Sequence, residues 1–141
     1  MSIVAFHEVK GPRWELALCR LVEAAYGRGE RLYLWADSEA AARRLDDLLW
    51  TFRDEAFVPH GLWQGEARLE EPVAVGWQAG NPNGATCLVL ARDAAPEEVA
   101  GFPRVLDLAP VDVPELRQAA RARYRAFRDA GFDVSFRAAG P

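Results

Sequence analysis

Hydrophobic residues follow two patterns along this chain: short apolar runs, and longer segments in which apolar residues recur every three or four positions. Ile3 to His7 is a short apolar run, and Trp14 to Tyr26 shows the helical spacing. Gly11-Pro12 can open this helix because proline is tolerated in a first turn, and Gly27 and Gly29 follow it as stop signals. The N-terminal part is therefore predicted to form a strand followed by an amphipathic helix.

The middle of the chain repeats this alternation. Arg31 to Ala36 is typical of a buried strand, and Ser38 is a suitable N-cap for a helix from Glu39 to Trp50. Val73 to Trp77 and Thr86 to Ala91 are predicted strands separated by a Gly- and Asn-rich turn at residues 80–84. We expect these two strands to form an antiparallel pair.

The C-terminal part is predicted to contain a short helix, a strand and a long helix. These are Pro96 to Val99, Val105 to Leu108, and Pro114 to Ala130, the last closed by Gly131. Helices that alternate with short apolar strands indicate a parallel sheet covered on both faces. The prediction is an α/β fold: a single three-layer α/β/α domain over residues 1–141, around a mainly parallel, Rossmann-like sheet.

Composition restricts the function and the compartment. The 141 residues are 50% hydrophobic, enough for one sizeable core, and 17 basic against 21 acidic residues give a net charge of −4. The surface as a whole therefore does not attract nucleic-acid phosphates. Cys19 and Cys87 lie far apart in apolar runs, which favours free thiols in a reducing compartment. Without a signal-peptide pattern or a long apolar stretch, a cytoplasmic location is expected.

Motifs for catalysis or cofactor binding are not evident. A phosphate site needs a glycine-rich loop between a strand and a helix, but Gly27-Arg28-Gly29 follows a helix. His7 and His60 have no partner at i+3 or i+4, and neither cysteine has a metal-ligand spacing. We therefore expect no catalytic residue, no metal and no cofactor.

The long C-terminal helix is predicted to carry a basic stripe. At about 100° per residue, four arginines fall within an arc of roughly 80°, namely Arg117, Arg121, Arg125 and Arg128. The adjoining arc is apolar and is expected to pack; it contains Leu116, Ala119, Ala120 and Phe127. Arg123 lies nearer the apolar arc and does not fit this arrangement unless its guanidinium group reaches out to solvent.

Tyr124 lies at the border between the two arcs. Its ring and the aliphatic arginine stems can wall an apolar pocket rimmed with guanidinium groups. Such a pocket suits an acidic peptide that ends in a hydrophobic residue, since arginine can hold a terminal carboxylate bidentately. A solvated charged face would also explain the stripe, but Glu115 and Asp129 compensate four like charges poorly. We therefore favour a binding site on this helix.

A second unusual feature is a concentration of aromatic residues around the end of the Glu39 helix and the loop after it. Leu48 to Phe52 is followed by Phe57 to His60 and by Leu62-Trp63. Aromatic side chains in a loop beside a helix end are typical of protein interfaces, although they can also close the edge of a core. For Trp50 and Phe57 both roles remain open at this point.

Both features coincide with a resemblance to a known family. Leu45 to Trp50 followed by Phe57 to His60 resembles the most recognisable segment of the chi subunit of bacterial DNA polymerase III. Ala120 to Arg128, with Ala130-Gly131-Phe132, resembles the C-terminal helix of that family, and order and spacing agree along nearly the whole chain. The resemblance implies a non-catalytic α/β/α subunit of the polymerase III holoenzyme that acts in DNA replication.

The resemblance also implies two protein partners. One is single-stranded DNA-binding protein, whose acidic, phenylalanine-terminated tail is implied to bind Arg121, Tyr124 and Arg125, flanked by Arg117 and Arg128. The other is the psi subunit, which contacts the clamp loader; the residues implied for it are Trp50, Phe57, Val58 and Pro59. Arginine replaces the lysine often seen at Arg117 and Arg125. A monomer or a one-to-one heterodimer is expected, with mainly indirect nucleic-acid contact and no membrane.

Two other functions remain possible from the sequence. An α/β fold hosts many small enzymes that act on nucleotides, although the missing phosphate loop argues against one here. The arginine stripe could instead bind single-stranded nucleic acid directly, which the net acidity and the few stacking aromatics on that helix make a weaker alternative.

Overall fold

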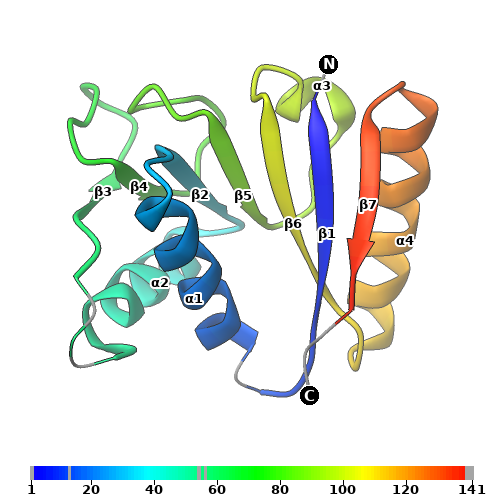
Figure 1. The fold of residues 1–141 in the computed structure, drawn as a ribbon, viewed down its shortest axis with the longest axis horizontal. Coiled ribbons are helices and arrows are strands. Elements are labelled where there is room, and N and C mark those ends of the chain that lie inside the picture. The colour runs from blue at the N-terminus through cyan, green and yellow to red at the C-terminus, as the bar shows by residue number, and fades with distance from the viewer. Residues whose placement is uncertain (1, 13, 54, 56, 139–141) are drawn as a thin grey trace.

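The computed structural model describes residues 2–12, 14–53, 55 and 57–138. The centre of the fold is a seven-stranded sheet (Figure 1). The strand order is β3-β4-β2-β5-β6-β1-β7, and every neighbouring pair is parallel. The strands are β1 (Ile3–Val9), β2 (Leu32–Ala36), β3 (His60–Trp63), β4 (Val73–Gly76), β5 (Cys87–Ala91), β6 (Arg104–Pro110) and β7 (Asp133–Arg137). The predicted α/β class is confirmed. Residues 1, 13, 54, 56 and 139–141 of the predicted domain lie outside the described residues.

Helices cover both faces of this sheet (Figure 1). Helices α1 (Trp14–Gly27) and α2 (Glu39–Thr51) pack on one face, and α3 (Pro96–Val99) and α4 (Pro114–Asp129) pack on the other. This is the predicted three-layer arrangement. In the described part of the chain, no helix is long and apolar enough to cross a membrane.

Strand β2 lies between β4 and β5 inside the sheet and shows how the two cores arise from one apolar run. All five of its residues are buried. Leu32 and Leu34 belong to the core under α1 and α2, whereas Tyr33 and Trp35 belong to the core under α3 and α4. Successive side chains of a strand point to opposite faces, so a strand covered on both faces needs apolar residues at every position.

The start of α2 agrees with the sequence prediction. The hydroxyl oxygen of Ser38 accepts a hydrogen bond from the backbone N–H of Ala41 at 3.1 Å. This bond satisfies one of the N–H groups that a helix leaves without an internal partner in its first turn.

The predicted antiparallel pair is wrong. β4 and β5 do not pair with each other, because both lie beside β2 in parallel: Val73 and Cys87 are each register partners of Leu32. The segment between them crosses β2 and does not close a hairpin. The Asn83 side-chain amide donates to the backbone oxygen of Leu32 at 2.9 Å, so this polar residue, 1% exposed, anchors the crossover to β2. A Gly- and Asn-rich turn gives no information on the strand order, which long-range pairing decides.

Strands β3 and β7 are additions to the sequence-based prediction. That prediction left the β3 residues in an aromatic loop and ended the fold at the last helix. The chain leaves α4 at Gly131, whose φ of +91° lies in the left-handed region that favours glycine. It then returns to the sheet as β7, beside β1, and forms one of its two edges. This places β7 next to α4 (Figure 1).

Candidate functional site

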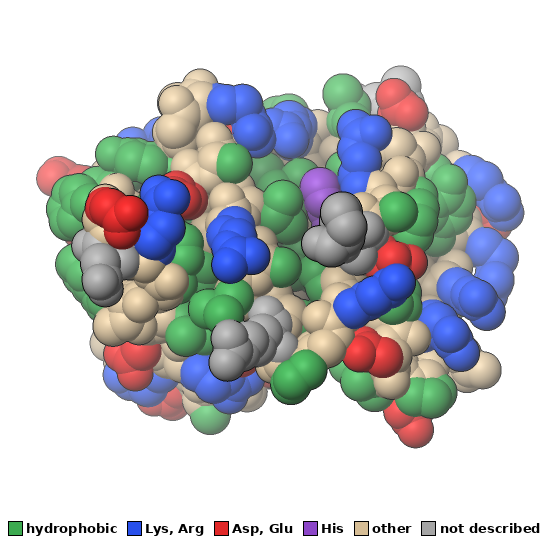
Figure 2. All heavy atoms as spheres, turned by 60° about the horizontal axis from the view of Figure 1, so that its bottom comes forward, with side chains coloured by type: hydrophobic (Ala, Val, Ile, Leu, Met, Phe, Trp, Pro, Cys, Tyr) green, Lys and Arg blue, Asp and Glu red, His purple; other side chains and the backbone are tan. Residues whose placement is uncertain are grey.

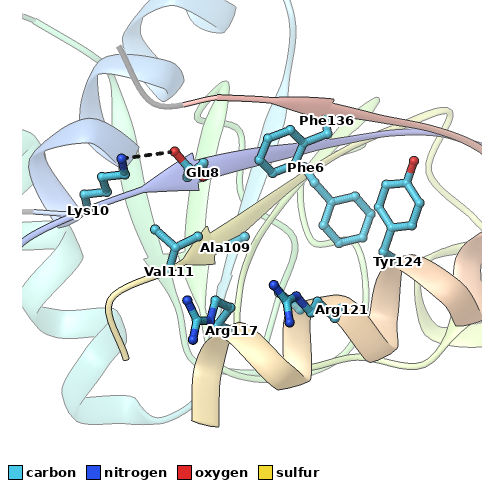
Figure 3. A pocket seen from close by; sticks show the side chains of 10 residues that line it. Phe6, Glu8, Lys10, Ala109, Val111, Arg117, Arg121, Tyr124 and Phe136 are labelled. Carbon is cyan, nitrogen blue, oxygen red and sulfur yellow. Dashed lines mark ion pairs between the residues drawn. The ribbon is translucent and has the colours of Figure 1, made fainter. Parts of the chain in front are cut away.

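A groove of about 540 Å³ lies between α4 and the carboxyl-terminal half of β1 (Figure 3). Its lining comes from α4, from the end of β6 and the residue after it, and from β1 and β7. The lining residues are Phe6, Glu8, Lys10, Ala109, Val111, Arg117, Ala120, Arg121, Tyr124 and Phe136. Three of the five residues implied for tail binding, Arg117, Arg121 and Tyr124, are therefore brought together in one cavity. We call this cavity the α4 groove.

The helix side of the α4 groove combines cations with an aromatic ring. Arg117 and Arg121 are exposed, and no carboxylate in the described residues forms an ion pair with either. Tyr124 is half-buried, and its ring packs on Phe6 with centroids 5.1 Å apart at 50°. Phe6 is 2% exposed and packs in turn on the buried Phe127. The floor is thus rigid and apolar, while the guanidinium groups remain free to bind an anion.

The sheet side of the α4 groove was not predicted from the sequence. It carries Glu8 near the end of β1 and Lys10 directly after that strand, joined by an ion pair of 3.6 Å, and Phe136 on β7. Phe136 is 52% exposed, a large apolar surface open to water. A signal for β7 was present in the alternation of Val134 and Phe136 with polar residues, which predicts a half-buried strand.

The remaining residues of the predicted stripe are exposed but do not line the α4 groove. Arg125 and Arg128 lie further along α4, and Arg128 is paired with the neighbouring Asp129 at 3.2 Å. Figure 2 shows basic side chains gathered on the side of the molecule formed by α4. On the arc predicted to pack, Ala120 and Phe127 are buried as expected, but Leu116 is 47% exposed, so its predicted place in the core is wrong.

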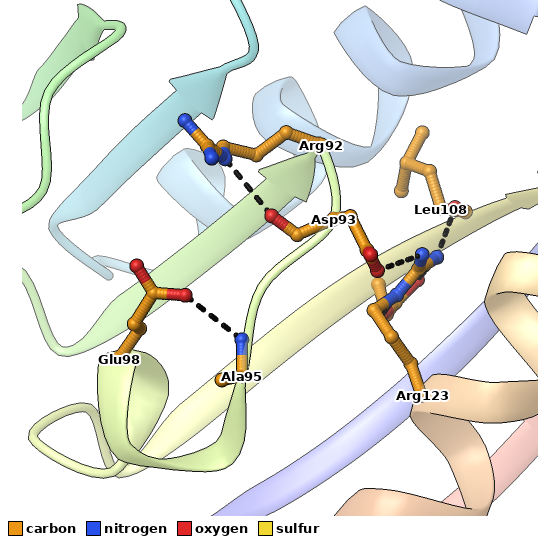
Figure 4. Close-up of polar contacts among 7 residues, drawn as sticks. Arg92, Asp93, Ala95, Glu98, Leu108 and Arg123 are labelled. Carbon is orange, nitrogen blue, oxygen red and sulfur yellow. Dashed lines mark hydrogen bonds and ion pairs between the residues drawn. The ribbon is translucent and has the colours of Figure 1, made fainter.

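Arg123 is the arginine that did not fit the stripe, and it lies inside the protein. Only 8% of it is exposed, and its guanidinium group donates to both carboxylate oxygens of Asp107 on β6. It also donates to Asp93, in the segment between β5 and α3, at 2.9 Å (Figure 4). Burial raises the pKa of Asp107 to about 6, and the hydrogen bonds from Arg123 oppose that rise. The two hydrogen bonds from Arg123 favour the ionised form of this carboxyl group, and Arg123 belongs to the structure of α4 and not to its exposed stripe.

The aromatic cluster after α2 forms an exposed apolar surface, which we call the Trp50 patch: Trp50 and Phe57. Trp50 is 55% exposed and Phe57 is 68% exposed, and their ring centroids lie 6.4 Å apart. The ring of His60 supports Trp50 from below, with centroids 4.5 Å apart. The His60 Nδ1 and Nε2 atoms lie 2.7 and 3.1 Å from the backbone oxygens of Val58 and Asp46. His60 therefore joins the loop to α2 and holds the patch in place.

The other two residues implied for psi binding are less accessible. Val58 is 1% exposed and packs in the core under α1 and α2, so its side chain cannot contact a partner and is excluded from the Trp50 patch. Pro59 is half-buried. Neighbouring residues in this extended segment point in opposite directions: the side chain of Phe57 points to solvent and that of Val58 into the core. Within the described ranges, no group of three or more His, Cys, Asp or Glu residues is placed to hold a metal ion.

Comparison with known proteins identifies the family. The model of the family described as "DNA polymerase III chi subunit, HolC" matches residues 1–135. The chain belongs to the DNA polymerase III chi subunit family. The DNA polymerase III subunit chi of Pseudomonas aeruginosa is 41% identical over 116 residues, covering 82% of this chain and 80% of that protein. Its Escherichia coli K12 counterpart is 32% identical over 122 residues, covering 86% and 82% of the two chains.

The chi subunit of Haemophilus influenzae is a third relative, 27% identical over 118 residues and covering 83% of this chain and 81% of that protein. The resemblance found in the sequence is therefore confirmed, and membership of the chi family places the chain among the subunits of DNA polymerase III, in DNA replication. Among solved structures, the crystal structure of T4 UvsW has a TM-score of 0.71 at 10% identity. It covers 97% of this chain, which spans 41% of that structure, and it shows a shared fold alone.

Proposed function

We propose that this chi-family subunit binds the acidic, phenylalanine-terminated tail of single-stranded DNA-binding protein in the α4 groove. The observation that carries the proposal is the joining of Arg117, Arg121 and Tyr124 with an apolar floor in one cavity. Guanidinium groups can hold a terminal carboxylate bidentately, while an apolar floor takes up the side chain of the last residue. A groove with only one of these properties would suit either an anion or an apolar ligand, but not this tail.

Arg125 and Arg128 are proposed to act before the tail is seated. Both are exposed on the same helix but outside the lining of the groove. Exposed charges of one sign attract an oppositely charged ligand over about a Debye length and so raise its association rate. Their removal is expected to slow association more than it speeds dissociation.

The Trp50 patch is proposed as the surface for a second partner, the psi subunit, which would connect the chain to the clamp loader. Trp50 and Phe57 are large exposed rings that pack against each other, and Trp50 also packs on the buried ring of His60. Exposed aromatic residues held on a rigid support are typical energetic centres of protein interfaces. Pro59, half-buried beside them, would lie at the margin of that contact.

Together the two surfaces support an adaptor that acts in the cytoplasm by binding and makes or breaks no bond itself. Holding single-stranded DNA-binding protein at one surface and the clamp loader at the other raises the local concentration of each near the other. The resulting gain in affinity depends on both contacts at once, so the loss of either surface would abolish the adaptor role without changing the fold.

Calorimetric titration with a peptide that copies the tail tests the proposal. The wild-type protein is expected to bind the peptide saturably, and both Arg121→Ala and removal of the terminal phenylalanine are expected to abolish measurable binding. Arg20→Ala is a matched control, because Arg20 is an exposed arginine on α1 outside the α4 groove. The titration is repeated at low salt, where contacts between charged groups are strongest.

Absence of binding by the wild type at low salt would refute the tail-binding role. The protein would then be titrated with single-stranded DNA and with a nucleotide panel, since the two alternatives from the sequence predict binding there. Stabilisation by a nucleotide at low concentration would favour an enzyme. Tight binding of naked single strands would favour a direct nucleic-acid role.

A further inference from the structure

The α4 groove has two chemically different ends (Figure 3). At one end lie three aromatic rings, Phe6, Tyr124 and Phe136. At the other end lie Lys10 and Arg117, with cations from both the sheet and the helix. A groove with an apolar end and a cationic end cannot bind an acidic, apolar-terminated peptide equally well in both directions.

Phe136 supplies the accessible part of the aromatic end. Phe6 and Phe136 are register partners on the neighbouring strands β1 and β7, so their side chains stand on the same face of the sheet, toward α4. Phe6 is 2% exposed, whereas Phe136 is 52% exposed. An apolar ligand group laid on this floor would therefore be covered by Phe136, and it would gain most of its new apolar contact there.

Lys10 supplies a cation to the opposite end from the sheet side. Its side chain is 64% exposed and forms a 3.6 Å ion pair with Glu8. Arg117 faces the same end from α4 (Figure 3). An acidic segment at this end would lie between cations on two walls. Arg121 lies on α4 between Arg117 and Tyr124, so it is the groove arginine next to the aromatic end, which favours placing the peptide terminus near Arg121 (Figure 3).

We infer that Phe136 and Lys10 are specificity-determining residues that set the direction of the bound peptide. The terminal apolar residue lies against Phe136, its carboxylate pairs with Arg121, and the preceding acidic residues extend toward Arg117 and Lys10. This inference rests on the proposed tail-binding function. It adds a ligand orientation and two recognition residues that are not part of the arginine stripe, one directly after β1 and one on β7.

The test measures dissociation constants for Phe136→Ser and Lys10→Gln with two peptides, the acidic tail ending in phenylalanine and the same tail ending in alanine. Phe136→Ser is expected to raise the dissociation constant of the phenylalanine peptide about fivefold to tenfold. The dissociation constant of the alanine peptide is expected to change by less than about twofold. Lys10→Gln is expected to raise the dissociation constants of both peptides by about twofold to fivefold. In a peptide with its upstream acids changed to amides, that effect of Lys10→Gln is expected to disappear.

Two control variants make a comparable change outside the α4 groove, one for the loss of an exposed apolar side chain and one for the loss of an exposed cation. Ile3→Ser removes an apolar side chain of the same 52% exposure from β1, at a position outside the α4 groove. Arg20→Gln removes an exposed cation from α1, also outside the groove. Both controls are expected to bind the two peptides like the wild type.

The outcomes separate this inference from the proposed function. If Arg121→Ala abolishes binding but Phe136→Ser and Lys10→Gln behave like their controls, the orientation is wrong and the tail-binding role stands. Equal weakening of both peptides by Phe136→Ser would place the terminal residue elsewhere in the groove and would also refute the orientation. If the wild type binds neither peptide, the tail-binding function fails and this inference fails with it.

Discussion

Arg123 on α4 and Asp107 on β6 form a buried, bidentate ion pair, with nitrogen–oxygen distances of 2.7 and 2.8 Å. The pair joins the middle of α4 to a central strand of the sheet and so sets the rotation of the helix about its axis. Because residues two positions apart on a helix point about 200° apart, turning Arg123 inward turns Arg121 outward. The pair therefore positions the cations of the α4 groove without touching its ligand.

Arg123→Ala is expected to lower the free energy of unfolding by roughly 3–5 kcal/mol, because it leaves the Asp107 carboxylate buried without its partner. Arg125→Ala is the matched control on the same helix; Arg125 is exposed, so its loss is expected to change that free energy by less than about 0.5 kcal/mol. Urea denaturation measures both. The double variant Arg123→Met with Asp107→Leu is expected to recover most of the loss, since no charge is then buried. A loss below about 1 kcal/mol in Arg123→Ala would contradict the structural role.

Phe57 and Val58 are adjacent in the chain but have opposite environments, which predicts opposite effects. Val58→Ala creates a cavity in a core where the side chain is 1% exposed, and we expect a loss of roughly 1–3 kcal/mol of unfolding free energy. Phe57→Ala removes a ring that is 68% exposed, so its effect on stability is expected to stay within about 0.5 kcal/mol. Binding of the psi subunit should show the reverse order. Equal loss of stability in the two variants would disprove the assigned environments.

The elements of this fold could be predicted where the signal is local. The apolar spacing of α1, the Ser38 cap of α2 and the apolar run of β2 each lie within a few residues, and all three predictions hold. The pairing of β4 and β5 was wrong because a turn between two strands does not specify their neighbours. β2 lies between them in the sheet, although it is about 40 residues before β4 in the sequence, so a local pattern does not predict this order.

The same distinction explains what could be predicted of the α4 groove. Arg117, Arg121 and Tyr124 share one helix, so their spacing alone placed them together. Phe136 and Lys10 reach the groove only through the pairing of β7 and β6 with β1, which no local pattern contains. Arg123 was ambiguous for the same reason, since its partner Asp107 lies 16 residues away on another element.

The proposed binding of an acidic tail predicts a moderate, and not a steep, dependence on salt. Raising the salt concentration from about 0.05 to about 0.5 M is expected to weaken the affinity for the phenylalanine peptide roughly tenfold, since exposed arginine–carboxylate contacts are screened. Binding should then level off, because the apolar contact does not depend on salt. Calorimetry across this range measures how the dissociation constant depends on salt concentration, and Arg117→Ala should make that dependence weaker. A continuing steep log-log decline with naked single-stranded DNA would instead support direct nucleic-acid binding.

His7 on β1 predicts how stability changes with pH. Burial lowers the pKa of His7, and the positive charges of Arg137 and Arg104 lower it further. In the unfolded chain this histidine takes up a proton near its ordinary pKa of about 6.5, so as the pH falls below that value protonation favours the unfolded state. His7→Gln removes this proton uptake. Between about pH 7.5 and about pH 5, the wild type is expected to lose more unfolding free energy than the variant.

The comparison isolates His7 because the carboxylates titrate alike in both proteins and cancel in the difference between them. Denaturation curves for each protein at the two pH values therefore measure the contribution of this one side chain. A wild type whose stability falls no more than that of His7→Gln would show that the folded state accepts the proton at His7 as readily as the unfolded chain does. The two arginines and the burial of the ring would then have no net effect on that equilibrium.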